Sequence, residues 1–345
     1  MIGRLIATAA LFTGALTIEV GGVKATFSNG GIEPRGVDQL QLWANSPQAT
    51  LMLDNSLHAG FAGVNTTWQN VISGAYVSTP EGVVIGTSRD GSALHTQLTM
   101  QPRERQHWSL KPNMGGTYRF AVIGETRNPQ TGAQTFGKLG KDMGNRQVQF
   151  AVHLGNAAAK GNVSQLQVFR EQLRSFPFPT YCLPGNEDIA GGGRKAWRQL
   201  FGEMPEVFSI GHDRFLLVDN AAGTLDKPTY AWLENTLKRA NDEHARHIFV
   251  FLHQPLVDVR PGLNQGMQDM AQVRQLLQLF QAHRVHTVFA GHIPMYARET
   301  RRGVYYVTSG GGGQKLAPLA GAGAINHYVR VEVNGDDVRA DAFKL

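Results

Sequence analysis

Apolar runs that end abruptly in polar residues recur through the second half of the chain. Five of them are followed by Glu125, Asn156, Asn186, His253 and His292, usually with a glycine just before the polar residue. A short apolar run of this kind is typical of a buried strand. Because the carboxyl ends of parallel strands meet at one edge of a sheet, we expect these five side chains to lie on a single polar rim.

Helical periodicity separates the apolar runs. Helices are predicted over residues 163–175, 230–240 and 267–282, where apolar positions recur with a spacing of three or four. Closing strands are predicted over residues 305–308 and 328–333, with a hairpin turn at Asn334-Gly335. Strands that alternate with helices indicate a layered α/β domain, which we place at residues 117–345.

The preceding region, residues 26–113, differs in composition and in hydrophobic pattern. It is rich in Gly, Ser, Thr and Asn, and its apolar residues come in short groups at 50–53, 82–86 and 94–100. Short strands between turn-forming residues indicate a small all-β domain. Residues 111–116 are the predicted linker, and Trp43, Trp68 and Trp108 are expected in the core rather than on a carbohydrate-binding face.

The N-terminus has the form of a secretory signal peptide. Arg4 precedes an apolar run over residues 5–18, and small residues permit a cut after Ala25. Residues 1–25 are therefore predicted to direct export to the periplasm or the extracellular space, although a buried first strand is an alternative. The run is shorter than the ~18 to 20 residues that cross a bilayer, so no transmembrane span is predicted.

Composition narrows the class of protein and of partner. The 345 residues are 42% hydrophobic and 17% charged, which is typical of a globular chain. The single cysteine, Cys182, excludes an internal disulfide. The net charge of +6 favours acidic partners. No long basic run accompanies it, so no specific nucleic-acid partner is predicted.

The order of the motifs matches a known family. The chain carries G-E-T-R, L-G-N, P-G-N-E-D, L-H-Q-P and G-H-I-P, at the ends of the five runs. This series resembles that of the calcineurin-like metallophosphoesterases, whose blocks are D-x-H, G-D, G-N-H-[DE], a His before Pro, and G-H-x-H. The resemblance implies a four-layer sandwich, two sheets flanked by helices, and some secreted relatives carry a small β domain ahead of it.

The resemblance also implies roles for single residues. In the family two metal ions polarise a phosphate and activate a bridging water. Five residues stand at metal positions: Glu125, Asn156, Asn186, His253 and His292. Three others depart from the pattern: Arg127 and Pro294 replace histidine ligands, and Glu187 replaces the histidine that protonates the leaving group.

These departures give two functional readings. The preferred one is a catalytically impaired member that binds a phosphorylated or other anionic small molecule, or a protein partner. The alternative is a phosphoester hydrolase with one divalent metal (Mn, Fe or Zn) at Asn156, Asn186, His253 and His292. It would have Glu125 or Glu187 as a base and Arg127 as a phosphate clamp. Whether the chain is an enzyme, and whether it holds any metal, is left open.

A further hypothesis concerns Arg127. A guanidinium between Glu125 and Glu187 would supply the positive charge that the first metal supplies in the family. Each residue also has a plainer interpretation: Arg127 as a surface arginine, Asn186 as a turn residue, and the two histidines as hydrogen-bonded structural groups.

Overall fold

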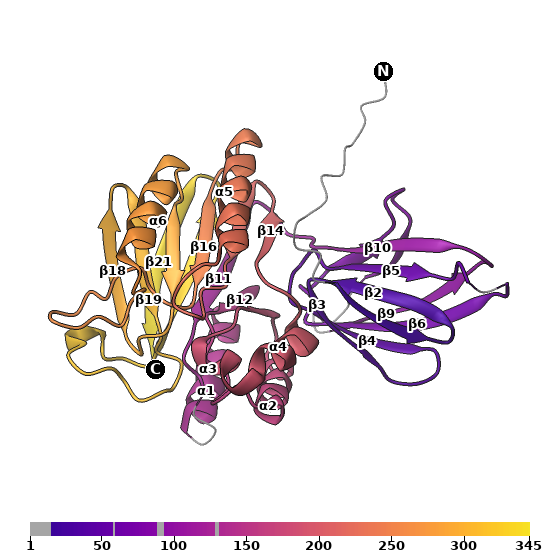
Figure 1. The fold of residues 1–345 in the computed structure, drawn as a ribbon, viewed down its shortest axis with the longest axis horizontal. Helices are drawn as coiled ribbons and strands as arrows, with labels where there is room; N and C mark the ends of the chain where they lie inside the picture. Colours follow the sequence, from indigo (N-terminus) through magenta and orange to yellow (C-terminus); the bar gives the residue numbers. More distant parts are fainter. Residues whose placement is uncertain (1–14, 58, 88–92, 128–130) are drawn as a thin grey trace.

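The computed structural model describes residues 15–57, 59–87, 93–127 and 131–345. Two β-sheets form within residues 16–111, and two further sheets with helices against them form from the following part of the described chain (Figure 1). The predicted fold class, a helix-flanked pair of sheets preceded by a small all-β domain, is confirmed. Within the described residues, no helix has the length and apolar character needed to cross a membrane.

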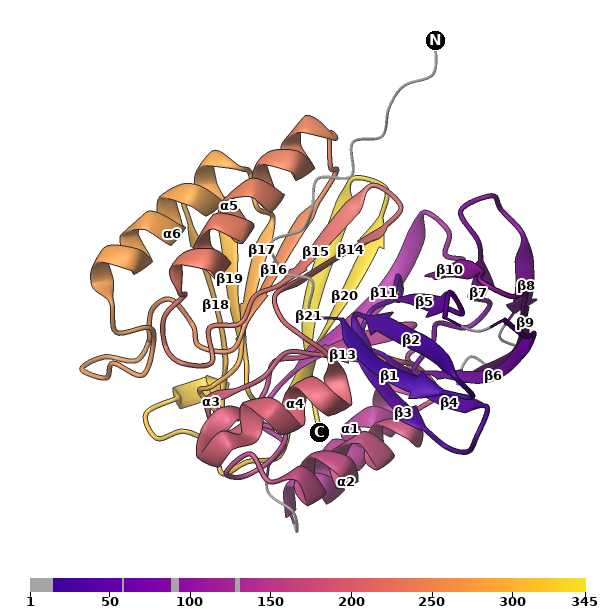
Figure 2. The same ribbon diagram turned by 45° about the vertical axis from the view of Figure 1, so that its right-hand side comes forward.

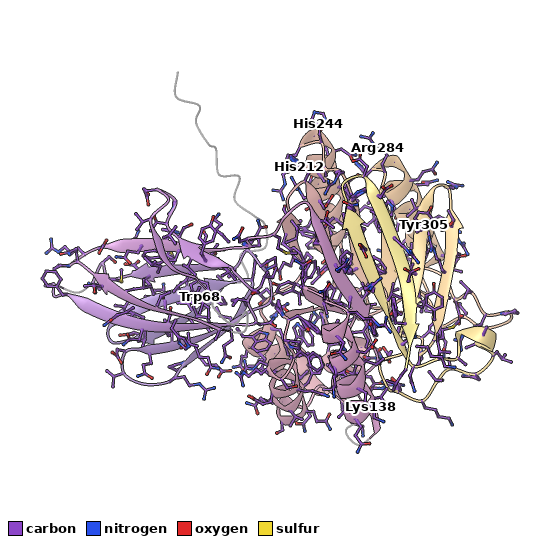
Figure 3. The ribbon with its side chains drawn as sticks, turned by 180° about the vertical axis from the view of Figure 1, so that it is seen from behind. Trp68, Lys138, His212, His244, Arg284 and Tyr305 are labelled. Atoms are coloured by element: carbon purple, nitrogen blue, oxygen red, sulfur yellow. The ribbon has the colours of Figure 1, made fainter. Side chains whose placement is uncertain are left out.

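Within the described residues, the N-terminal sandwich has ten strands. They are β1 (Leu16–Val20), β2 (Val23–Ser28), β3 (Gly30–Pro34), β4 (Gln39–Ala44), β5 (Thr50–Asp54), β6 (Ala62–Gln69), β7 (Tyr76–Ser78), β8 (Val84–Thr87), β9 (Ala93–Met100) and β10 (Arg105–Lys111). One sheet has the order β1-β2-β5-β10-β7-β8 and the other β3-β4-β6-β9. Trp43, Trp68 and Trp108 are buried, as predicted, and Trp68 lies inside this sandwich (Figure 3).

The start of the sandwich bears on the predicted signal peptide. The expected cut after Ala25 falls within β2, where Val23, Ala25 and Phe27 are fully buried. Cleavage there would remove β1 and half of β2, so this cut position is at odds with the sheet. Strand β1 includes only the last three residues of the apolar run, and these are not buried. Residues 1–14 lie outside the described residues, so the buried first strand and export both stay predictions.

The second part contains two sheets. Its strands are β11 (Thr117–Ile123), β12 (Phe150–His153), β13 (Thr180–Cys182), β14 (Glu206–Ile210), β15 (Asp213–Leu217), β16 (Ile248–Leu252), β17 (Thr287–Ala290), β18 (Tyr296–Arg301), β19 (Val304–Ser309), β20 (His327–Asn334) and β21 (Asp337–Lys344). The β11 sheet has the order β13-β12-β11-β20-β21, and the β16 sheet has the order β14-β15-β16-β17-β19-β18. Strands β11, β12 and β13 are parallel, as are β15, β16, β17 and β19.

Helices cover the outer face of each sheet. The α-helices are α1 (Thr131–Asn145), α2 (Val163–Arg174), α4 (Gly193–Phe201), α5 (Lys227–Asp242) and α6 (Met270–Ala282), together with the short α3 (Asn186–Ile189), which begins at the cleft residue Asn186. Helices α1, α2 and α4 share a core with the β11 sheet, and α5 and α6 with the β16 sheet (Figure 2). The three predicted helices are confirmed and correspond to α2, α5 and α6, whereas α1, α3 and α4 were not predicted.

Aromatic rings fill the space between the two sheets. Phe120 of β11 is fully buried and has ring centroids 5.3 Å away on Phe150, Phe215 and Phe249. Rings at these separations add stacking and edge contacts to the burial of apolar area. The strands that carry the polar rim are therefore anchored by a rigid aromatic core directly behind it.

Two asparagines of the sandwich bind the open edge of β13. Asn45 donates to the Cys182 carbonyl at 2.8 Å and accepts from its N–H at 2.7 Å, and Asn70 does the same with Thr180 at 2.9 and 2.8 Å. Each amide thus takes the place of a neighbouring strand. An unpaired strand edge would otherwise promote association with other chains. The sandwich therefore completes the β11 sheet.

Glu206, at the start of β14, is buried. Among the described residues, neither of its carboxylate oxygens has a hydrogen bond of normal geometry, although the Ser46 hydroxyl is near enough to lower the pKa of this carboxyl group. Burial outweighs that effect and raises the pKa from 4.5 to about 8. The folded state therefore keeps this proton in a pH window where the unfolded chain has lost it, so the stabilisation is complete below pH 4.5 and is lost as the pH rises toward 8.

Glu206→Gln is expected to remove this pH dependence, because the amide stays neutral. Between about pH 5 and pH 7 the free energy of unfolding of the wild type should fall by about 2 to 3 kcal/mol relative to that of the variant. Urea denaturation of both proteins at several pH values measures the difference. Parallel pH profiles for the two proteins would show that Glu206 is ionised in the folded state.

Candidate functional site

The five polar side chains predicted to share a rim do so. They follow the ends of β11, β12, β13, β16 and β17 and form a connected chain of hydrogen bonds. Asn156 Nδ2 lies 3.1 Å from Glu125 Oε2 and 3.2 Å from Asn186 Oδ1, which in turn lies 2.8 Å from His253 Nε2 and 3.1 Å from His292 Nδ1. The cleft is thus built from both sheets.

Three of these residues have a left-handed backbone. The φ angles are 65° for Glu125, 57° for Asn156 and 62° for His292, and each residue follows a glycine at a strand end. Such a conformation costs a residue with a side chain about 1 to 3 kcal/mol and is concentrated at functional sites. The sequence analysis missed this strain, although the repeated glycine-polar pairs are a signal that could have indicated it.

Glu125 is fully buried at the centre of the cleft. Its Oε2 accepts from Asn156 at 3.1 Å, and its Oε1 accepts from the backbone N–H of His292 at 3.0 Å. Burial raises its pKa to about 8, against the opposite effects of the Asn156 hydrogen bond and the Arg127 charge. Glu125 therefore joins the two sheets through two hydrogen bonds to its carboxyl group.

Asp188 holds the cleft loops together from behind. It is fully buried and accepts backbone N–H groups from Asn156 at 2.7 Å, Gly185 at 2.8 Å and Ala158 at 2.7 Å. Burial raises its pKa to about 6, although these donors act in the other direction. Asp188 matches the [DE] position of the family motif, but its three backbone partners could not be predicted from the sequence.

One oxygen and two nitrogen atoms lie close together in the cleft: Asn186 Oδ1, His253 Nε2 and His292 Nδ1. His253 Nδ1 donates to the Leu154 carbonyl at 2.8 Å, which leaves a lone pair on Nε2 when the ring is neutral. That Nε2 faces Asn186 Oδ1 at 2.8 Å and His292 Nδ1 at 3.2 Å. Because lone pairs repel, the arrangement needs one electropositive centre, either a proton on His292 Nδ1 or a cation.

Both histidines are held in the neutral form by burial. Burial lowers the pKa of His253 to about 3, and it lowers the pKa of His292, with the Arg127 charge acting in the same direction.

His153, on β12, is a different case. It is buried with both ring nitrogens occupied, since Gly155 N–H donates to Nδ1 and Nε2 lies 3.1 Å from the Thr126 hydroxyl.

Arg127 and Glu187 form an ion pair at the rim. Arg127 Nη1 lies 2.6 Å from Glu187 Oε1, and the two side chains are 25% and 32% exposed. The exposure means that solvent or a ligand reaches both groups. Arg127 also acts on Glu125 through its charge, which lowers the pKa of that carboxyl group.

A glycine-rich loop after β19 closes against this cleft. A Cβ atom on Gly310 would lie 2.1 Å from the Ile293 carbonyl, and one on Gly312 would lie 2.4 Å from the Gly124 carbonyl. Gly312 also donates its N–H to Gly124 at 2.9 Å. The sequence analysis treated this segment as a flexible loop, whereas close backbone approach is what its glycines permit.

Two of the residues that the resemblance places at the first metal position have no side-chain atom that could bind a metal ion. Arg127 is a permanent cation and Pro294 has no side-chain donor atom. Both oxygens of Glu125 already accept hydrogen bonds. Among the residues that the structure describes, no three His, Cys, Asp or Glu side chains gather in a way that could hold a metal.

The residues that the resemblance places at the second metal position could bind a metal ion in part. Asn186, His253 and His292 present three neutral donors that face one another. Asn156 accepts from the Glu187 N–H at 3.0 Å through its oxygen and therefore turns its amide nitrogen, which cannot bind a metal, toward Asn186. In this orientation three of the four predicted donors are available.

Comparison with known proteins places the chain in a family. The sequence profile of the calcineurin-like phosphoesterases matches residues 118–296, which is half of the chain. No curated protein matches the sequence.

Solved structures of this fold resemble the whole chain or its second part. Purple acid phosphatase PPD1 from yellow lupin is 14% identical with a TM-score of 0.59, covering 93% of this chain and 77% of that one. GAP50 of Plasmodium is 18% identical with a TM-score of 0.53 over 67% and 85%, and a dimetal phosphatase from Danio rerio is 12% identical with a TM-score of 0.54 over 66% and 96%. The chain is therefore a member of the calcineurin-like phosphoesterase family.

Proposed function

We propose that this protein binds an anionic ligand in the family's cleft and does not carry out the two-metal reaction. The observation that supports this most is the Arg127–Glu187 ion pair, at 2.6 Å. By the family pattern, these two residues stand where a metal ligand and the leaving-group acid stand in active members. The chain therefore has a fixed organic cation where those enzymes recruit a metal ion.

The chemistry of Arg127 suits an anion. Its guanidinium keeps its charge at all physiological pH values and matches the geometry of phosphate and carboxylate groups. Glu187 is the counterion when the cleft holds no ligand, and its partial exposure lets a stronger anion take its place. The net charge of +6 attracts such ligands over a distance.

A protein partner is the other form of this proposal. GAP50, which has a similar fold, is described as the anchor in the inner membrane complex of Plasmodium. The fold thus serves assembly in at least one described case. Export of this chain, which would decide where either kind of partner is met, belongs to the same proposal.

Arg127→Gln is expected to weaken the binding of inorganic phosphate about tenfold or more, because the loss of one charged contact costs about 1.5 to 3 kcal/mol. Isothermal titration calorimetry measures the dissociation constant. The matched control is Arg119→Gln, which breaks a comparable ion pair, with Glu332 at 3.0 Å, on β11 away from the cleft. Equal phosphate affinity in the wild type and both variants would contradict anion binding at Arg127.

One observation favours a second candidate, a hydrolase with a single metal ion. The facing donors of Asn186, His253 and His292 would hold one divalent cation, which would polarise a phosphoryl oxygen when bound. In this candidate Arg127 would orient the phosphate and Glu187 would accept a proton. With no carboxylate among its donors, such a site is expected to bind a dication weakly.

A further inference from the structure

An apolar pocket opens beside Arg127. It lies between α1 and α2, at the carboxyl ends of β11 and β12, and its volume is about 180 Å³. Its wall includes Thr126, Arg127, Ala133, Ala158, Val168 and Phe169. Crevices at the carboxyl ends of parallel strands are where open α/β sheets bind their ligands.

The walls of this pocket are held in place by hydrogen bonds. Gln172 of α2 donates to the Ala133 carbonyl of α1 at 2.7 Å, which fixes the distance between the two helices. Gln165 of α2 accepts the Ala159 N–H at 2.8 Å, which ties the same helix to the loop that follows Asn156. The pocket is therefore preformed, and a ligand needs little ordering of the protein to enter it.

The pocket exposes apolar surface that the fold does not use. Val168 is 66% exposed on its rim, while Phe169 on the same helix is buried in its floor. Apolar side chains that line a concavity next to polar groups mark a ligand site more often than isolated exposed ones do. A cavity of about 150 Å³ lined by apolar side chains holds one benzene molecule. This pocket is therefore large enough for one aromatic ring or a short branched alkyl group.

We infer that the ligand of the cleft is a small organic anion whose charged group binds Arg127 and whose single compact apolar group, such as a phenyl ring, fills this pocket. The inference rests on the proposed binding of anions at Arg127. It follows from the position of that residue, which pairs with Glu187 on the cleft and also lines the pocket. A ligand without an apolar group would leave the pocket filled with poorly held water. A ligand without a charge would leave the guanidinium of Arg127 paired with Glu187.

Two phosphonates test the inference, because they carry similar charged groups and cannot be hydrolysed as phosphoesters. Phenylphosphonate is expected to bind the wild type at least about tenfold more tightly than methylphosphonate, since burial of a ring gains more than the corresponding 1.4 kcal/mol. Calorimetric titration of both compounds measures this ratio. Equal affinities would overturn the assignment of the pocket.

Ala133→Leu tests the contribution of the pocket without changing the charge of Arg127. The added side chain projects from α1 into the pocket, so the affinity for phenylphosphonate should fall until the ratio of the two affinities is about one. Ala231→Leu, at an exposed position of α5, is the matched control and should keep the wild-type ratio. Val168→Ser, at an exposed position of the rim, gives a second test that does not depend on packing and should lower the ratio in part.

The variants also distinguish failure of this inference from failure of the proposed function. If Ala133→Leu and Val168→Ser leave the ratio unchanged, the pocket assignment is wrong, while loss of both phosphonates in Arg127→Gln still supports anion binding. If Arg127→Gln binds both phosphonates as the wild type does, the proposed function and this inference are both wrong.

Discussion

Asp188→Ala is expected to lower the free energy of unfolding by about 3 to 5 kcal/mol. The substitution leaves three buried backbone N–H groups, those of Asn156, Gly185 and Ala158, without an acceptor. Each unsatisfied group costs about 1 to 3 kcal/mol, and removal of a buried charge returns part of the total. Chemical denaturation followed by circular dichroism measures the change.

Two controls show whether this effect belongs to the buried acceptor. Glu187→Ala removes the neighbouring carboxylate, whose ion pair is partly exposed, and should cost less than about 1 kcal/mol. Asp188→Asn keeps one acceptor oxygen and should have an intermediate effect. A loss below about 1 kcal/mol for Asp188→Ala would mean that water replaces the carboxylate and that the loops do not depend on it.

Restoration of the family's residues is expected to change metal content the most. The variant with Glu125→Asp, Arg127→His, Asn156→Asp, Glu187→His and Pro294→His should retain about two ions per chain after desalting, as two-metal sites do. The wild type should retain none, because its first position carries a permanent cation and its second has no carboxylate. Elemental mass spectrometry after incubation with manganese, iron and zinc measures both.

The same measurement separates the two candidate functions. One tightly held ion in the wild type, lost in His253→Ala, would support the single-metal hydrolase and contradict the binding role. Addition of His253→Ala to the five-residue variant should lower its metal content, which checks that the ions occupy the cleft. A folded five-residue variant that retains no metal would show that the likeness to the family does not extend to the site.

The helices show what local patterns can predict. Helix α2 was predicted within one residue of its observed end, and helices α5 and α6 each have an aspartate as N-cap, Asp226 and Asp269, beside a clear apolar face. Helix α1 was missed because glycines at 137, 140 and 144 disfavour a helix by about 1 kcal/mol each. Packing explains two of them, since a Cβ atom on Gly140 would lie 2.4 Å from the Phe176 ring and one on Gly144 would lie 2.8 Å from the Pro177 ring, whereas Gly137 has room for a side chain.

The site, too, could be predicted from the sequence only in part. The order of five strand ends along the chain predicts which residues share the rim, because parallel strands bring their carboxyl ends together. Their hydrogen-bond partners were not predictable. The acceptor of His253 is a backbone carbonyl 99 positions away, and the amide orientation of Asn156 depends on the Glu187 N–H.

The sequence alone predicts the fold class and the rim, and the family resemblance implies the replacement of several metal-site residues and an ion pair of Arg127, because these depend on periodicity and on residue type. Only the tertiary structure gives the 2.6 Å distance of the Arg127–Glu187 pair, the burial that raises the pKa of Glu125 to about 8, and the apolar pocket between α1 and α2. Those features depend on distances between segments far apart in the chain. Local patterns carry no information on such distances, because only the packing of the two sheets and their helices sets them.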